Sequence, residues 1–98
     1  MQFVITAHDG KNVLEQRMAV RPEHLANMAR LGSHVLCAGG ILDGDGKPAG
    51  SVLVVDFDSR DRLEEYLASE PYIREKVWQD VTAEPMNVVI LGGEKVGQ

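Results

Sequence analysis

Alternating apolar and polar side chains predict the first element of the chain, a strand over residues 2–8. Because successive side chains of a strand point to opposite faces, Phe3, Ile5 and Ala7 share one face of it. Residues 13–21 follow a turn and carry only scattered apolar positions. That irregular pattern predicts a connector between the strand and the next element.

A helix is predicted to begin at Pro22, because a proline is well tolerated in the first helical turn, where its missing N–H would have no partner. Leu25, Met28, Ala29 and Gly32 then recur at helical spacing. We expect this apolar stripe to face the core.

Two strands joined by a turn come next. Residues 35–42 and 51–57 are rich in Val and Leu, and the intervening segment 43–50 is rich in Asp, Gly and Pro. This pattern predicts a hairpin. Either Asp58 or Ser59 is then placed to cap a second helix.

The second helix carries Leu63, Tyr66 and Leu67 on one face, and it ends before Pro71 because a proline pushes the preceding residue out of the helical region. Three further segments complete the chain. They are a short helix, a last strand and a polar tail, predicted over residues 72–79, 86–91 and 92–98.

The resulting order, β-α-β-β-α-β, is typical of the ferredoxin-like fold, which belongs to the α+β class and has an antiparallel sheet. We expect a single domain over residues 1–98. Strands 51–57 and 86–91 carry apolar residues on both faces, whereas two helices can cover only one face of such a sheet. We therefore predict a homodimer in which the two sheets face each other.

Composition narrows the class of protein. The net charge of -5 argues against nucleic acid as a partner, since phosphate binding needs a basic surface. No signal peptide and no membrane span are recognisable, so a cytoplasmic location is the default expectation. The single cysteine, Cys37, allows no internal disulfide and no zinc cluster of thiolates, and its apolar neighbours predict that it is buried.

The segment Asp43-Gly44-Asp45-Gly46 resembles the beginning of a calcium loop. However, Lys47 occupies the next ligand position, and no glutamate closes a loop of the required length. Asp-Gly pairs are typical of hairpin turns. The sequence therefore favours a turn here, and we predict neither a metal site nor a cofactor.

A basic cluster formed by Arg17, Arg21 and His24 stands out in this acidic chain. Guanidinium groups suit carboxylates and phenolates, and histidine exchanges protons near neutral pH, so the cluster indicates a site for a small anionic or phenolic molecule. In the first turn of a helix, His24 would be kept neutral by the positive helix end. Alternatively, the arginines pair with Glu15 or Glu23 and the histidine only packs.

The chain resembles the YCII family over roughly residues 2–91. The matching segments are Leu14-Glu15-Gln16-Arg17, Val20-Arg21-Pro22-Glu23-His24-Leu25, Cys37-Ala38-Gly39-Gly40, Gly50-Ser51, Glu70-Pro71-Tyr72 and Glu84-Pro85-Met86. The resemblance implies a dimeric α+β barrel similar to muconolactone isomerase, with a pocket built around His24 and an acidic partner. The acidic residue of the family's Asp-Pro-Tyr element is here Glu70, which is one methylene longer and changes the reach of the carboxylate.

The resemblance further implies a cofactor-independent lyase or isomerase that acts on a small oxygenated ring, in its most specific form by dehydrochlorination of a chlorinated hydroxyhydroquinone. His24 would be the general acid and base, and Glu70 would orient it or share its protons. The residues expected to hold the substrate are Arg17, Arg21, Ser51 and Tyr72. Two alternatives are a dimeric module that binds a small anion without chemistry and a purely structural dimer.

Overall fold

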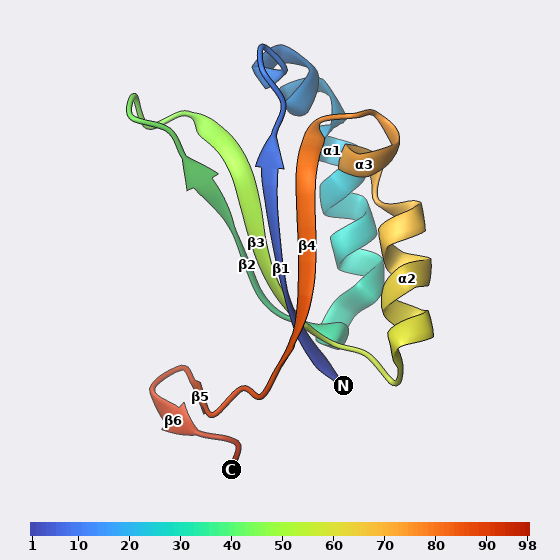
Figure 1. Cartoon of the computed structure of the whole chain (residues 1–98), viewed down its shortest axis with the longest axis vertical. Helices are drawn as coiled ribbons and strands as arrows, with labels where there is room; N and C mark the ends of the chain where they lie inside the picture. The colour runs from blue at the N-terminus through green and yellow to red at the C-terminus, as the bar shows by residue number, and fades with distance from the viewer.

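Four antiparallel strands form the main sheet, in the order β2-β3-β1-β4. In chain order they are β1 (Gln2–Asp9), β2 (Val35–Leu42), β3 (Pro48–Asp56) and β4 (Trp78–Met86). The computed structural model describes residues 1–98 and adds α1 (Leu14–Leu31), the 3-10 helix η1 (Gly32–His34), α2 (Arg60–Ser69) and α3 (Pro71–Arg74). Figure 1 shows α1 and α2 on the same face of the sheet. This arrangement confirms the predicted ferredoxin-like α+β fold and its antiparallel sheet.

A small hairpin follows the main sheet. It consists of β5 (Ile90–Leu91) paired with β6 (Glu94–Lys95). Figure 1 shows it projecting beyond one end of the sheet, away from both long helices. The predicted polar tail therefore contains part of a hairpin.

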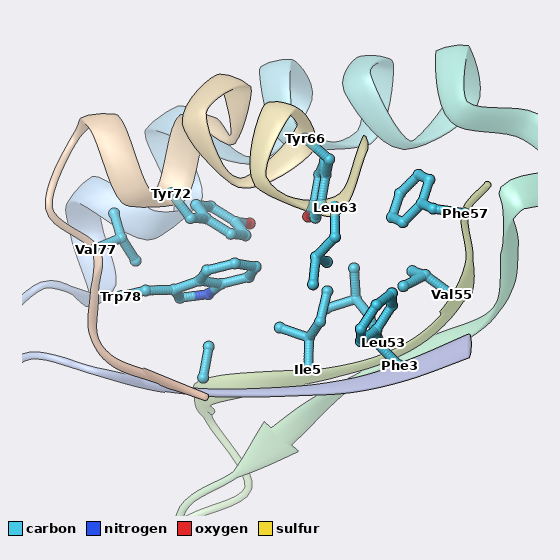
Figure 2. Close-up of a cluster of buried hydrophobic side chains, with 11 residues drawn as sticks. Phe3, Ile5, Leu53, Val55, Phe57, Leu63, Tyr66, Tyr72, Val77 and Trp78 are labelled. Carbon is cyan, nitrogen blue, oxygen red and sulfur yellow. The ribbon is translucent and has the colours of Figure 1, made fainter. Parts of the chain in front are cut away.

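The core lies between the sheet and the helices, as Figure 2 shows. Phe3, Ile5 and Ala7 are fully buried there, which confirms the predicted inner face of the first strand. Because β1 is hydrogen-bonded to β3 on one side and to β4 on the other, its inner side chains occupy the centre of the sheet. The other members of the core cluster are Leu53, Val55, Phe57, Leu63, Tyr66, Tyr72, Val77 and Trp78.

Local chemistry accounts for the hairpin turn and for the start of α2. The Asp43 carboxylate accepts the main-chain N–H groups of Asp45 at 2.8 Å and Lys47 at 3.0 Å, and these hydrogen bonds lower the pKa of Asp43. The Ser59 hydroxyl caps α2 by accepting the main-chain N–H of Arg62 at 3.3 Å. Both features confirm the sequence predictions, with Ser59 rather than its neighbour as the cap.

Helix α1 begins at Leu14 rather than at Pro22, so the predicted connector over residues 13–21 is wrong. A proline inside a helix removes one main-chain hydrogen bond and disfavours helical geometry in the residue before it. Tertiary contacts compensate for this loss. Near the start of the helix, for example, the Gln16 side chain donates to the main-chain oxygen of Glu75 at 2.7 Å.

The apolar stripe predicted on α1 does not form its buried side. Leu25 is 45% exposed and Ala29 is exposed as well, whereas the buried residues of the helix are Arg17, His24 and Asn27. The stripe borders an open cleft, and of its members only Met28 also packs against the core. The buried polar residues have hydrogen-bond partners on neighbouring elements, which makes their burial tolerable.

The last long strand is β4, so the strand predicted over residues 86–91 and most of the helix predicted over 72–79 are wrong. Lys76 has a positive φ of 58°, a left-handed conformation that ends α3 and turns the chain into β4. Pro85 lies within this strand and has no main-chain N–H to donate. It is accommodated because β4 is an edge strand, which leaves one side of its backbone without a neighbour.

The sheet face opposite the helices is partly apolar and is covered by no other element. Val4, Val52 and Val54 are half-buried on this face, and Cys37 is exposed beside Val54. The prediction that the cysteine is buried is therefore wrong, because its side chain lies on the uncovered face. Pairing with a second copy stays a prediction. No helix is long and apolar enough to cross a membrane.

Candidate active site

A histidine and a glutamate, far apart in the sequence, meet between the helices. His24 Nδ1 lies 2.7 Å from Glu70 Oε1, and the side chains of the two residues are 10% and 0% exposed. Since an ionised carboxylate only accepts hydrogen bonds, Nδ1 carries the proton, and Nε2 is then the basic nitrogen of the neutral ring. Nε2 has no hydrogen-bond partner within the protein.

This geometry corrects the electrostatic argument made from the sequence. His24 lies in the middle of α1 rather than in its first turn, so the positive helix end is too far away to act on it. The group that faces the ring is the Glu70 carboxylate. Glu70, whose reach the sequence left open, therefore contacts the imidazole.

Glu70 is held by its place at the junction of α2 and α3. It is the N-cap of α3, and its Oε1 accepts the main-chain N–H of Tyr72 at 3.0 Å. Pro71 occupies the first position of α3, where it needs no hydrogen-bond partner. The second carboxylate oxygen, Oε2, accepts the Tyr66 hydroxyl at 2.5 Å. Three donors thus satisfy a carboxylate that water does not reach.

Aromatic rings fix the plane of the imidazole. The His24 ring stacks on Tyr72 with centroids 4.2 Å apart and an angle of 20° between the planes. Trp78 meets the imidazole edge-on, at 6.0 Å between centroids. Burial raises the pKa of the Tyr72 hydroxyl, while the nearby Arg17 and Arg21 oppose that shift. Tyr72 is therefore a neutral hydroxyl beside the histidine at neutral pH.

Arg17 is buried, and its guanidinium is engaged within the protein. Nη1 donates to both carboxylate oxygens of Asp9, at 2.8 and 3.0 Å, while Nη2 donates to the main-chain oxygen of Gly50 at 3.1 Å and to Ser51 Oγ at 2.9 Å. The guanidinium also lies over the Tyr72 ring, 4.7 Å from its centroid. Because these contacts use both terminal nitrogens and Asp9 balances the charge, this geometry favours a structural role over the expected clamp on a ligand.

Gly50 permits this arrangement. A Cβ atom at this position would lie 2.4 Å from the main-chain oxygen of Ala7, a distance that requires the backbone to move. Only glycine allows the two strands to approach this closely while the Gly50 oxygen accepts from Arg17.

Arg21 differs from Arg17 in its exposure and in its contacts. It is exposed, and it forms neither a salt bridge nor a hydrogen bond in the protein. Glu23, the partner considered for it, lies 3.5 Å from Arg74 instead. The pairing of the arginines with Glu15 or Glu23 is therefore not observed, and Arg21 keeps its charge available.

A cleft of about 720 Å³, which we call the His24 cleft, brings most of these residues together. It is lined by five of the six predicted site residues, namely Arg17, Arg21, His24, Ser51 and Tyr72, and the sixth, Glu70, lies behind the histidine. The rest of the lining is largely apolar and includes Met18, Leu25, Met28, Leu42 and Leu53, with Gly39 and Gly40 on the β2 side. No acidic side chain lines the cleft.

Two residues that support the site, Asp9 and Tyr66, were missed by sequence reasoning. Asp9 stands directly after the strand predicted over residues 2–8, and Tyr66 was predicted only as part of the apolar face of the second helix. Their hydrogen bonds to Arg17 and Glu70 depend on tertiary structure. A carboxylate directly after a strand, eight residues before Arg17, was the only local signal for the first pair.

A second cleft, which we call the His34 cleft, lies near the C-terminal end of α1 and has a volume of about 370 Å³. His34 is exposed, its Nδ1 lies 2.8 Å from the main-chain oxygen of Asp56, and its ring stacks on Phe57 at 5.4 Å. Tyr66 and Arg62 also line this cleft.

Taken together, the fold and the site define a ferredoxin-like α+β domain with a histidine–carboxylate pair beside a cleft. The model of the YCII-related domain matches residues 1–87. The chain therefore belongs to the YCII-related family, as its resemblance indicated.

Curated relatives support this assignment, two of them of similar length and one longer. An uncharacterized protein of Haemophilus influenzae is 34% identical over 97 residues, which cover 91% of this chain and 99% of that protein. Protein YciI of Escherichia coli is 31% identical with the same coverage. Aspercryptin biosynthesis cluster protein B of Emericella nidulans is 35% identical over 86 residues, and the match spans only 55% of that longer protein.

Solved structures share the fold. The 5-chloro-2-hydroxyhydroquinone dehydrochlorinase TftG of Burkholderia phenoliruptrix, solved in complex with 2,5-dihydroxybenzoquinone, aligns with a TM-score of 0.83 and 22% identity, covering 88% of this chain and 93% of that one. A putative antibiotic biosynthesis monooxygenase of Bacteroides thetaiotaomicron aligns with a TM-score of 0.58 and 15% identity, covering 94% and 91%. At these identities the likeness shows the fold alone.

Proposed function

We propose that the chain is a small enzyme that uses His24 as a general acid and base on an oxygenated ring compound bound in the His24 cleft. One observation carries the proposal. His24 Nδ1 is held by the buried carboxylate of Glu70, and Nε2 has no partner in the protein while the ring lines the cleft. A histidine held in this way can take a proton from a bound hydroxyl and return it to another atom, which typically contributes about 10²–10⁴-fold to the rate.

The lining of the cleft favours a ligand with an anionic or phenolic oxygen. Arg21 is a cation without a partner, and no acidic side chain competes for it inside the cleft. Ser51 and Tyr72 also line the cleft, beside the apolar wall. A planar ring with oxygen atoms along one edge therefore matches both sides of the cleft.

Dehydrochlorination of a chlorinated hydroxyhydroquinone is the specific reaction that we propose. In this reaction His24 removes a proton from a ring hydroxyl and returns it to the ring carbon that carries chlorine. Chloride then leaves with the electron pair of the carbon–chlorine bond while a second hydroxyl loses its proton, and the product is a hydroxyquinone. The carbon–chlorine bond is reduced as the ring is oxidised, so the net change is loss of HCl and needs no external oxidant. The name and quinone complex of TftG, which shares the fold, support this choice.

The test is to incubate the protein with 5-chloro-2-hydroxyhydroquinone without oxygen and to measure chloride and quinone. We expect stoichiometric release of both, and we expect His24→Ala to lower the rate by about 10²–10⁴-fold. His8→Ala is the matched control, because His8 is exposed at the end of β1 and does not line the cleft.

The same samples distinguish the alternative of a binding module. Titration with 2,5-dihydroxybenzoquinone that shows binding, together with no chloride release from the substrate, would favour a module that holds the ligand without chemistry. The absence of both binding and turnover would refute the proposed site.

We also infer that two copies of the chain pair through the uncovered sheet face. The support is the partly apolar strip formed by Val4, Val52 and Val54, which no helix covers. Light scattering coupled to gel filtration is expected to show a dimer, and Val54→Lys is expected to shift it to the monomer because a charge on the strip cannot be buried at low cost. A wild-type monomer at tens of micromolar would contradict this inference.

A further inference from the structure

We propose that Tyr66 is a positioning residue for the His24–Glu70 pair, holding the carboxylate oxygen that the histidine does not use. The proposal rests on the acid–base role given above to His24. It extends the pair to a chain of three side chains, in which the last member contacts neither the cleft around His24 nor a ligand bound there.

The hydrogen bonds divide the two oxygens of Glu70 between different partners. Oε1 lies 2.7 Å from His24 Nδ1 and accepts the main-chain N–H of Tyr72 at 3.0 Å. Oε2 accepts the Tyr66 hydroxyl at 2.5 Å and has no other partner. If this donor were lost, one oxygen of a fully buried carboxylate would have no hydrogen bond.

Helix α2 places the tyrosine. Tyr66 lies in the last turn of α2, and Glu70, four residues later, is the residue that ends the helix, so the two side chains come within hydrogen-bond distance. Tyr66 is only 3% exposed, and its ring packs 6.0 Å from that of Phe57. Figure 2 shows it descending from the helices toward the sheet beside Leu63. Packing therefore keeps the hydroxyl in position when the active site is empty.

Electrostatics keep Tyr66 a donor. Burial and the negative charge of Glu70 both raise the pKa of the Tyr66 hydroxyl far above its usual range, so it keeps its proton at any pH at which the protein works. A donor of this kind stabilises the ionised carboxylate and prevents it from rotating. The carboxylate in turn fixes the tautomer and the orientation of the imidazole.

The decisive variant is Tyr66→Phe, which removes the hydroxyl and keeps the ring. With 5-chloro-2-hydroxyhydroquinone we expect kcat to fall on the order of tenfold with little change in KM, because the ground-state contacts in the cleft are retained. We also expect the acid limb of the pH–rate profile to move to higher pH, since a carboxylate that loses a donor takes up a proton more readily. A residue that only packs would not move that limb.

Ser69→Ala is the matched control. Its hydroxyl lies at the same end of α2, donates to the main-chain oxygen of Tyr66 at 2.7 Å and accepts from the Asn27 side chain at 3.3 Å, but it does not contact Glu70. We expect this variant to lose these two hydrogen bonds, with a cost in stability, and to keep the wild-type pH profile. Denaturant unfolding of both variants separates their effects on stability from those on the pH profile.

A second measurement needs neither turnover nor a variant. In the NMR spectrum of the free, ¹⁵N-labelled wild-type protein, we expect a His24 Nδ1 proton and a Tyr66 hydroxyl proton that both exchange slowly with water. In Tyr66→Phe the His24 proton should exchange at least several-fold faster. A Tyr66 hydroxyl that exchanges like free tyrosine, or an unchanged His24 proton and pH profile in the variant, would overturn the proposal. Absence of turnover in the wild type would refute the proposed function and leave this NMR result to decide on Tyr66.

Discussion

The His24 cleft and the His34 cleft contain similar side chains in different surroundings. Each histidine stacks on an aromatic ring, and each has an oxygen within hydrogen-bond distance of Nδ1. For His24 this oxygen belongs to a fully buried carboxylate, and for His34 it belongs to the main chain at the surface. A neutral carbonyl orients a ring, whereas a buried carboxylate also stabilises the charge that the ring acquires during proton transfer.

The arginines of the two clefts differ in the same way. In the His34 cleft, Arg62 lies 2.9 Å from Glu65, and both side chains are largely exposed. In the His24 cleft, one arginine is buried with its own carboxylate and the other has no partner. A ring-stacked histidine beside an arginine is thus not enough to indicate a site. The buried acid and the unpaired cation are the features that separate the first cleft from the second.

The largest expected effect concerns the support of the His24 cleft. Arg17→Ala removes one partner of a buried ion pair and leaves Asp9 charged and without its donor. We expect the free energy of unfolding, measured by urea denaturation, to fall by about 3–5 kcal/mol. Arg62→Ala in the other cleft is the matched control and should cost less than about 1 kcal/mol, because an exposed pair contributes little. Equal losses in the two variants would abolish the distinction between the clefts.

Tyr66 lines the His34 cleft and donates to Glu70, so it links the two regions. Its pKa is raised in the folded state, whereas in the unfolded chain it titrates near 10. The unfolded state therefore loses its proton first, and the stabilisation present below about pH 10 is lost as the pH rises above it, by about 1.4 kcal/mol per pH unit. Urea denaturation at pH 9, 10 and 11 should show this slope in the wild type, and a smaller one in Tyr66→Phe.

An intermediate effect is expected from the unpaired cation. Arg21→Ala should weaken the binding of 2,5-dihydroxybenzoquinone about tenfold, or roughly 1.4 kcal/mol, while the free energy of unfolding changes by less than about 0.5 kcal/mol. Calorimetric titration and urea denaturation measure the two quantities. Arg30→Ala, on the same helix but outside the cleft, is expected to change neither by much. If Arg30→Ala weakened binding equally, the effect would be one of net charge and not of position.

The smallest effect is expected for the second histidine. His34→Ala should leave turnover of 5-chloro-2-hydroxyhydroquinone within about twofold of wild type and change the free energy of unfolding by less than about 1 kcal/mol, as for other exposed side chains. Steady-state kinetics of His34→Ala and His24→Ala, measured side by side, compare the turnover of the two variants. A tenfold loss of turnover in His34→Ala would mean that the His34 cleft takes part in the reaction.

Elements with a strong local pattern could be predicted from the sequence. The alternation in β1, the Asp-Gly turn and the Ser59 cap each depend on residues that are neighbours in the chain. The start of α1 and the position of β4 could not be predicted in this way. Both elements contain a proline, which disfavours a helix interior and a strand, and both are held by contacts with distant residues that no local pattern shows.

The residues of the candidate site could be predicted from the sequence to different degrees. His24 stood out in the basic cluster, and Glu70 and Tyr72 could be named because the chain resembles a family. The contact between His24 and Glu70 joins residues 46 positions apart and could not be predicted without the fold. Arg17 was predicted to bind the ligand. Its partner Asp9 lies on the other side of a turn, and no local pattern indicated that the two side chains pair. The charges were visible in the sequence, whereas their pairing depended on which side chains became buried.

Arg17 is buried in the structure and Arg21 is exposed, and this difference has a consequence for how proteins of this kind diverge in evolution. The residues that hold the cleft open are buried and coupled to one another, so a change in any of them endangers the fold. Arg21, which we propose selects the charge of the ligand, is exposed and bound to nothing else. If it has this role, a single substitution at position 21 would redirect the scaffold to a neutral or cationic molecule at almost no cost in stability, and one architecture would acquire new substrates by small steps.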